Sequence, residues 1–166
     1  MSLQIRKATE ADVPLIAWFI RQLADYERML DETVMTEEIL RESLFGSRAS
    51  AEVVLGYYQD KPVGFAVFFH NFSTFLGRPG LYLEDLFVIP EMRGKGFGRA
   101  LLVHLAKIAR ERNCGRFEWT VLDWNESAIQ FYKNLGAIPM NEWMIFRVTG
   151  EALDRLATSV DEGSGQ

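Results

Sequence analysis

The sequence predicts a mixed α/β fold in which helices and a sheet form layers. Short apolar or alternating runs, typical of strands, are interspersed with segments whose apolar residues recur at helical spacing. With 166 residues, of which 48% are hydrophobic and 25% charged, the chain can bury a sizeable core. We therefore expect a single domain over residues 1–158, followed by a polar, frayed tail over residues 159–166.

The N-terminal part is expected to hold one strand and two helices. Residues 3–8 alternate as a strand does, and Thr9 then reads as a helix N-cap with Asp12 as its acidic partner. Thr36 caps a second helix that runs to about Phe45. The first helix should bury one face, made of Val13, Ile16, Ala17, Ile20, Leu23 and Ala24.

The middle of the chain predicts a hairpin and a third strand. Residues 51–58 and 63–70 are apolar runs separated by the turn 59–62, and residues 81–89 form the next strand after a loop over 71–80. The remaining elements are expected to be helix 100–112, strand 116–122, helix 125–135, strand 142–148 and helix 151–157.

Composition excludes several classes of protein. A net charge of −5 argues against nonspecific nucleic-acid binding. The single cysteine, Cys114, excludes an internal disulfide, and with His70 and His104 it gives no zinc-ligand spacing, so no metal is expected. No apolar run approaches the roughly 18 residues of a membrane span, and the N-terminus lacks a signal sequence. We expect a cytoplasmic protein that binds no membrane.

A glycine-rich turn joins the strand ending near Ile89 to the following helix. Glycines at alternating positions leave backbone N–H groups uncovered, and these groups, with the positive end of the helix, suit a phosphate or pyrophosphate. Cationic side chains surround the same turn. The candidate anion-binding residues are Arg93, Gly94, Lys95, Gly96, Phe97, Gly98 and Arg99.

Two better-known nucleotide motifs do not fit this turn. A P-loop requires Gly-Lys-Ser/Thr, but Gly98 is followed by Arg99 and Ala100. A Rossmann fingerprint requires G-x-G-x-x-G, and the spacing here differs. A flexible strand–turn–helix without a ligand remains the alternative at this point.

A second block lies at residues 124–137. Asn125 is a good N-cap, and Tyr132 follows seven residues, about two helical turns, later, so that both can face the same side. Taken alone, this block is most simply a capped amphipathic helix with a core tyrosine.

Together the two blocks resemble the GNAT N-acetyltransferase superfamily. The first matches R/Q-x-x-G-x-G/A, and the second, about 30 residues later, reads N-x-x-A-x-x-F-Y-x-x-x-G-A. Residues 23–27, 81–88 and 124–126 look like the diamine acetyltransferase branch, which includes spermidine/spermine and thialysine enzymes. The resemblance covers about residues 5–157. It implies a largely antiparallel central sheet flanked by helices, acetyl-CoA as donor, a small cationic amine as acceptor, and a homodimer.

Acetyl transfer from a thioester requires a neutral amine, a donor to the developing oxyanion, and a proton for the departing thiolate. The resemblance implies Glu84 as the base, acting through water, with Leu83 and Leu86 able to raise its pKa. Adjacent strand residues face opposite sides, so Glu84 and Asp85 should not share a role unless a bulge intervenes. Tyr132 is the candidate acid. A surface carboxylate and a core tyrosine are the alternatives.

The resemblance also implies further contacts. Backbone N–H groups would orient the acetyl carbonyl and the pantetheine arm at Leu86, Phe87 and Val88, and the second block would contact the cofactor through Asn125, Glu126, Ser127 and Tyr132. Acceptor contacts would come from Tyr26, Glu27, Glu84, Glu118, Trp119, Thr120 and Glu142.

The acceptor's size stays open. Phe75 stands where a tryptophan would be natural in a spermidine enzyme, and the segment 138–143 is short. A smaller amine or an ω-amino acid such as thialysine or lysine is therefore as reasonable as a long polyamine. A protein acceptor and a noncatalytic acyl-CoA-binding regulator are the other functions considered.

Overall fold

The computed structural model describes residues 2–160, and the chain forms two compact units. Unit 1 comprises Met1–Thr120 and unit 2 comprises Val121–Gln166. Most of the expected tail, residues 161–166, lies outside the described residues. That residues 1–158 act as one domain stays a prediction.

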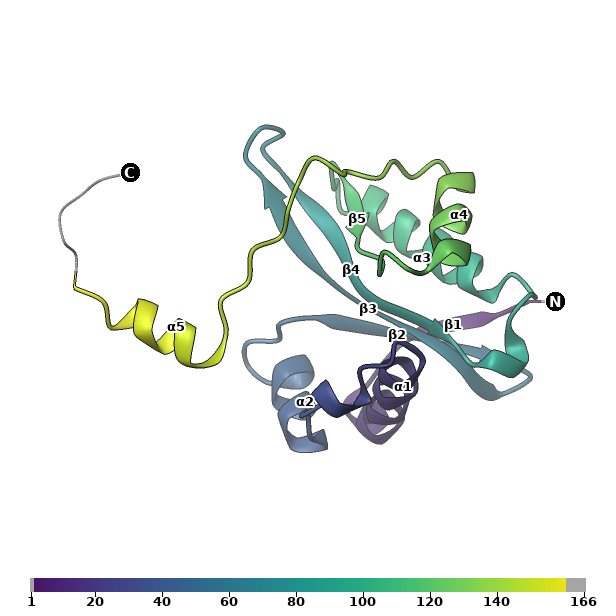
Figure 1. The fold of residues 1–166 in the computed structure, drawn as a ribbon. Coiled ribbons are helices and arrows are strands. Elements are labelled where there is room, and N and C mark those ends of the chain that lie inside the picture. The colour runs from purple at the N-terminus through teal and green to yellow at the C-terminus, as the bar shows by residue number, and fades with distance from the viewer. Residues whose placement is uncertain (1, 161–166) are drawn as a thin grey trace. The chain divides into compact units, whose positions relative to one another are not determined.

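Unit 1 is built on one five-stranded sheet (Figure 1). The strands follow one another in chain order, each antiparallel to the next except the last, which runs parallel to its neighbour. This confirms the expected mixed, largely antiparallel α/β fold. The strands are β1 (Gln4–Lys7), β2 (Glu52–Tyr58), β3 (Lys61–Ser73), β4 (Arg78–Val88) and β5 (Phe117–Trp119).

Helices cover both faces of this sheet. Figure 1 shows α1 (Val13–Tyr26) and α2 (Glu37–Phe45) on one face and α3 (Phe97–Glu111) on the other. Three short 3₁₀ turns connect these elements: η1 (Glu10–Asp12), η2 (Leu30–Glu32) and η3 (Pro90–Met92). Strand β3 therefore packs against α1 and α3 on its two faces.

The caps expected at Thr36 and Thr9 are confirmed by their hydrogen bonds, but Thr9 caps the 3₁₀ turn η1, and α1 itself begins at Val13. The N–H of Ile39 donates to Oγ1 of Thr36 at 3.1 Å, which caps α2. The N–H of Thr9 donates to Oδ2 of Asp12 at 2.8 Å, which fixes the chain before α1. These contacts are local, so the sequence alone could specify them.

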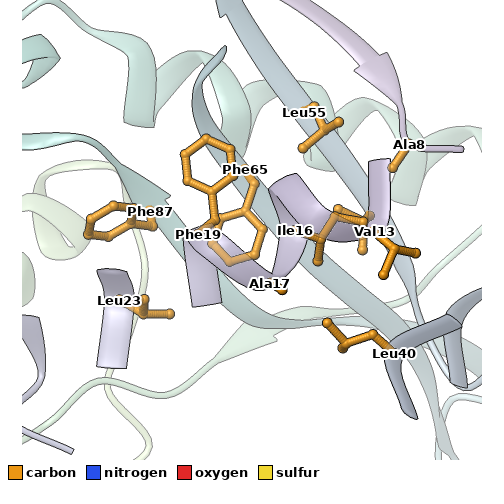
Figure 2. Close-up of a cluster of buried hydrophobic side chains, with 11 residues drawn as sticks. Ala8, Val13, Ile16, Ala17, Phe19, Leu23, Leu40, Leu55, Phe65 and Phe87 are labelled. Atoms are coloured by element: carbon orange, nitrogen blue, oxygen red, sulfur yellow. The ribbon is translucent and has the colours of Figure 1, made fainter. Parts of the chain in front are cut away.

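The core on the α1 face is built around stacked aromatic rings. Phe19 of α1 stacks on Phe65 of β3 with centroids 5.1 Å apart, and it meets Phe87 of β4 edge-on at 6.5 Å. Figure 2 shows these rings with the aliphatic side chains that surround them. Burying each phenylalanine contributes about 1.5–3 kcal/mol, so this cluster fixes α1 on the sheet.

The expected bounds of three strands were wrong, and a fourth expected strand is not formed. The strands β3 and β4 extend well into the expected loop 71–80, because their ladder continues to the pair Ser73 and Arg78. The expected strand 116–122 is shorter, because β5 pairs with β4 only over Leu81–Leu83. The expected strand 142–148 is not formed: its seven residues have no ladder partner among residues 2–160, and a strand requires one.

Unit 2 contains the helices α4 (Glu126–Asn134) and α5 (Gly150–Ala157). Oδ1 of Asn125 accepts from the N–H of Ala128 at 3.3 Å, which confirms the predicted cap of α4. Residues 143–149 between the two helices are irregular. Across residues 2–160, none of the helices has the length and apolar character needed to cross a membrane.

Candidate active site

The strand β4 carries a bulge at the candidate base. Asp85 pairs with Val67 of β3, but Leu83 pairs with the next residue, Phe68. Glu84 is therefore an extra residue on β4 without a Cα partner on β3. The condition under which Glu84 and Asp85 could share a role is thus met.

The bulge moves Asp85 to the α1 face of the sheet. Its partner Val67 packs against the aromatic core on that face. Leu83, two residues earlier, pairs with Phe68, which lies 5.8 Å beneath the guanidinium of Arg112 at the end of α3. Without the bulge, Leu83 and Asp85 would share one face. The extra residue therefore places a carboxylate on the face that α1 covers.

Asp85 lies in an acidic and partly buried environment. Burial, together with the nearby charges of Glu84 and Glu27, raises the pKa of Asp85 to about 7. Glu27 directly follows α1, and burial also raises its pKa above the ordinary value. A carboxyl group that titrates near neutral pH can take up and release a proton under physiological conditions.

The end of α1 is tied to the glycine-rich turn by Arg93. Its Nε donates to the carbonyl of Val88 at 2.9 Å, and its guanidinium carbon lies 4.6 Å from the ring centroid of Tyr26 and 5.2 Å from that of Phe87. These distances are those of cation–π contacts. The predicted acceptor pair Tyr26–Glu27 therefore lies in unit 1 beside residues of the predicted cofactor turn.

The turn after β4 has the backbone of an anion site. Gly94 and Gly96 have φ of +78° and +82°, a left-handed conformation that favours glycine. Gly96 is also the N-cap of α3, and it offers no side chain to the first N–H groups of the helix. A Cβ added at Gly94 or Gly96 would meet no heavy atom within 4 Å, so the turn is open. Lys95 and Arg99 are exposed cations on the same segment.

The neighbouring edge of β4 offers backbone groups to a ligand. On the side of β5, pairing ends at Leu83, and none of the described strands continues along Glu84–Val88. An extended pantetheine arm can bind such an edge as an additional strand would. The open turn and the open edge together fit an acyl thioester joined to a pyrophosphate, as in acetyl-CoA.

The other predicted site residues are divided between the two units. Glu118, Trp119 and Thr120 lie at β5 in unit 1, where Nδ2 of Asn71 donates to Glu118 at 3.4 Å. Unit 2 holds Asn125, Glu126, Ser127, Tyr132 and Glu142. The roles of both groups stay predictions.

Asp85 is the residue that sequence reasoning set aside. Strand alternation predicts that Asp85 and Glu84 lie on opposite faces of the sheet, and nothing in the apolar run around Asp85 indicates a bulge. The adjacent Glu84–Asp85 pair on one strand was the available signal, because two neighbouring carboxylates are rare in a buried strand.

The sequence matches the model of the Acetyltransferase (GNAT) family over residues 16–137. The chain belongs to this family of acetyltransferases. It is therefore an acyltransferase, and the family uses acetyl-CoA as its donor. The matched stretch includes parts of both units.

Named relatives narrow the family to the diamine and thialysine branch. The chain is 37% identical to the thialysine N-epsilon-acetyltransferase of Sus scrofa, over 94% of this chain and 98% of the relative. It is 33% identical to the L-ornithine N5-acetyltransferase NATA1 of Arabidopsis thaliana, over 94% and 88%. Among solved structures, the integron cassette protein VCH_CASS6 of V. cholerae superposes with a TM-score of 0.80 at 32% identity, over 96% and 99% of the two chains.

Proposed function

We propose that this enzyme transfers the acetyl group of acetyl-CoA to the primary amine of a small cationic acceptor by direct attack. The side-chain amine of an amino acid such as thialysine, ornithine or lysine is the first expectation, because thialysine and ornithine acetyltransferases are among its relatives. The observation that carries the proposal is the partly buried Asp85, held beside Glu84 and Glu27. Diamines and polyamines are the alternative acceptors.

The acidic surroundings of Asp85 favour a cation. Three carboxyl groups, Glu27, Glu84 and Asp85, lie close enough for their charges to interact. An ammonium group among them would offset the repulsion that raises the pKa of Asp85. The ring of Tyr26, which ends α1 beside Glu27, adds an aromatic face, which also attracts ammonium groups.

The Glu84–Asp85 pair then takes the proton that blocks attack. An ammonium group has no free electron pair, so its N–H bond must break, with the proton passing to a carboxylate of the pair directly or through water. Asp85 is the member that holds this proton near neutral pH, because a base works best when its pKa lies near the working pH. The neutral amine can then attack the carbonyl carbon.

Other groups of the chain hold the donor and complete the transfer. Acetyl-CoA supplies the acetyl group as a thioester, and coenzyme A leaves as the thiol when the carbon–sulfur bond breaks. The open edge at Leu86–Val88 donates N–H groups to the acetyl carbonyl and the pantetheine arm, and the open turn over Gly94–Arg99 binds the pyrophosphate. In this proposal Tyr132 donates the proton to the thiolate and regains one from the attacking nitrogen as the amide forms, and Asn125–Ser127 add cofactor contacts.

The proposal is tested by thiol release from acetyl-CoA with a panel of acceptors. The panel contains thialysine, lysine, ornithine, putrescine, spermidine, spermine and a short peptide. We expect release that depends on the acceptor and is fastest with the ω-amino acids. Glu84→Gln and Asp85→Asn should each lower kcat more than 10-fold, in the range of general-base catalysis. Asp25→Asn, which removes an exposed carboxylate near the end of α1, is the matched control.

Two results would change the assignment. Release with the peptide alone would replace the small amine by a protein acceptor. Full activity of both Glu84→Gln and Asp85→Asn would remove the carboxylate pair from the mechanism, whatever the acceptor.

A further inference from the structure

Arg93 occupies the first position of the predicted pyrophosphate motif, but its side chain is engaged elsewhere. Its Nε donates to the carbonyl of Val88, and its guanidinium lies against the rings of Tyr26 and Phe87 at 4.6 and 5.2 Å. A guanidinium held by these contacts is oriented toward the end of α1. Arg93 therefore contacts the end of α1 as well as belonging to the pyrophosphate motif.

We propose that Arg93 is a positioning residue for the acceptor: it holds Tyr26 and the following Glu27 beside Asp85, while other groups of the turn bind the pyrophosphate. This inference rests on the proposed function, because it concerns the acceptor side of that site. It makes the glycine-rich turn a support for acceptor binding as well as for cofactor binding.

The residues that the side chain of Arg93 contacts on the sheet, Phe87 and Val88, are firmly held. Phe87 is only 4% exposed and lies edge-on to Phe19 in the aromatic core. Val88 is the last residue of β4, so the Nε hydrogen bond ties the turn to the end of the sheet. The position of the guanidinium is thus set by the core and the sheet, and it can transmit that position to Tyr26.

The side chain of Tyr26 at the end of α1 depends on this contact for its position. Tyr26 is the last residue of α1, its side chain is 41% exposed, and Arg28 two residues later has a φ of +61°, unfavourable for a side-chain-bearing residue. The backbone of this end is capped, because the N–H groups of Arg28 and Met29 donate to the carbonyls of Asp25 and Ala24 at 3.1 and 2.8 Å, so it is the exposed ring that lacks support. The contact with Arg93 covers one face of the Tyr26 ring and so restricts the position of Glu27.

These contacts require arginine rather than any cation. Lysine has no Nε–H beside a planar group, so it cannot donate to Val88 and also lie flat on two rings. Lys95 and Arg99, with the N–H groups at the start of α3, remain for the negative charge of the pyrophosphate. Acceptor positioning and charge binding are therefore separable by substitution.

The experiment compares Arg93→Lys and Arg93→Gln with Lys95→Gln. Acetyl-CoA affinity is measured by calorimetry, and KM for the amine and kcat are determined separately. We expect both Arg93 variants to raise the KM of the amine by about 5- to 10-fold, the size of a lost cation–π contact and hydrogen bond, and to change the acetyl-CoA Kd by less than about 2-fold. Lys95→Gln should weaken acetyl-CoA binding and leave the amine KM unchanged.

A double-mutant cycle links the effect to Tyr26. Tyr26→Leu removes the ring, and combining it with Arg93→Lys should raise the amine KM less than the product of the single effects. Tyr26→Phe keeps the ring and should retain the coupling to Arg93. Independent effects of the two residues would overturn the proposal.

Rescue by lysine would also overturn it. If Arg93→Gln loses acetyl-CoA affinity, Arg93→Lys restores it, and the amine KM stays constant, Arg93 is a charge ligand of the pyrophosphate. If the unmodified enzyme acetylates no amine, the proposed function fails. In that case two measurements that need no acceptor still test the role of Arg93. The acetyl-CoA affinities of its variants show whether Arg93 binds charge, and a Tyr26–Arg93 double-mutant cycle measured in unfolding free energy shows whether it supports α1.

Discussion

Replacing Asp85 with asparagine should stabilise the protein and inactivate it. Burial and the charges of Glu84 and Glu27 raise the pKa of Asp85 from the ordinary 3.8 to about 7. At 1.36 kcal/mol per pH unit, this difference is equivalent to about 4 kcal/mol. Asparagine carries no charge to desolvate but remains polar, so about 4 kcal/mol is the upper limit of the gain.

The gain must depend on pH in a defined direction. The folded state binds the Asp85 proton more tightly than the unfolded state, so the native protein loses stability as pH rises from about 4 to about 7. Below pH 4 the group is protonated in both states, and the unfavourable charge is absent. The Asp85→Asn variant should therefore match the unmodified protein near pH 4 and exceed it in stability above pH 7.

Urea unfolding between pH 4 and 8.5 measures this difference. Asp25→Asn removes an exposed carboxylate and should show no comparable rise in relative stability with pH. Glu84→Gln removes one of the charges acting on Asp85, so it should lower the pKa of Asp85 and reduce the gain from Asp85→Asn in the double variant. If the stability difference between Asp85→Asn and the unmodified protein were constant with pH, the argument that burial and neighbouring charges raise the pKa of Asp85 would be refuted.

Four further outcomes are expected. The kcat/KM of the unmodified enzyme should fall below pH about 7, and Asp85→Asn should lose this dependence, as measured by initial rates. Gly96→Ala, at a φ of +82°, should destabilise the protein by about 1–2 kcal/mol and weaken acetyl-CoA binding, whereas Gly98→Ala, whose methyl would lie 3.8 Å from Leu86, should retain both in urea unfolding and calorimetry. Thr36→Ala should remove the cap of α2 and about 1 kcal/mol of unfolding free energy without changing kcat. Sedimentation should show the homodimer that the family resemblance implies, and a monomer at all concentrations would contradict it.

Local signals made much of the fold predictable from the sequence. The starts of α2 and α4 were visible because a side-chain oxygen at Thr36 or Asn125 caps a backbone N–H three residues later. The apolar runs gave the strands near their observed places, and the two glycine-containing motifs gave the family. Each of these signals lies within a few consecutive residues.

The features that were not predicted correctly depend on residues far apart in the sequence. The bulge at Glu84 arises from the pairing of β4 with β3, and the early end of β5 arises from its pairing with Leu81–Leu83. Neither pairing can be read from one segment. The expected strand 142–148 has the composition of a strand, but a strand forms only where a neighbour supplies its hydrogen bonds.

The candidate site lies where the regular structure of unit 1 is interrupted. Within the 13 residues from Glu84 to Gly96, the end of β4 and the turn before α3 contain a bulge at Glu84, an edge without a partner among the described strands, and the left-handed glycines Gly94 and Gly96. Each interruption has an energetic cost, and each opens a carboxylate or backbone N–H group to a ligand. Phe87 lies between them and is anchored in the aromatic core, which keeps the interruptions in place. Replacing a carboxylate at the bulge should therefore separate stability from activity, as expected for Asp85→Asn, whereas substitutions of Gly96 or Phe87 should lower both.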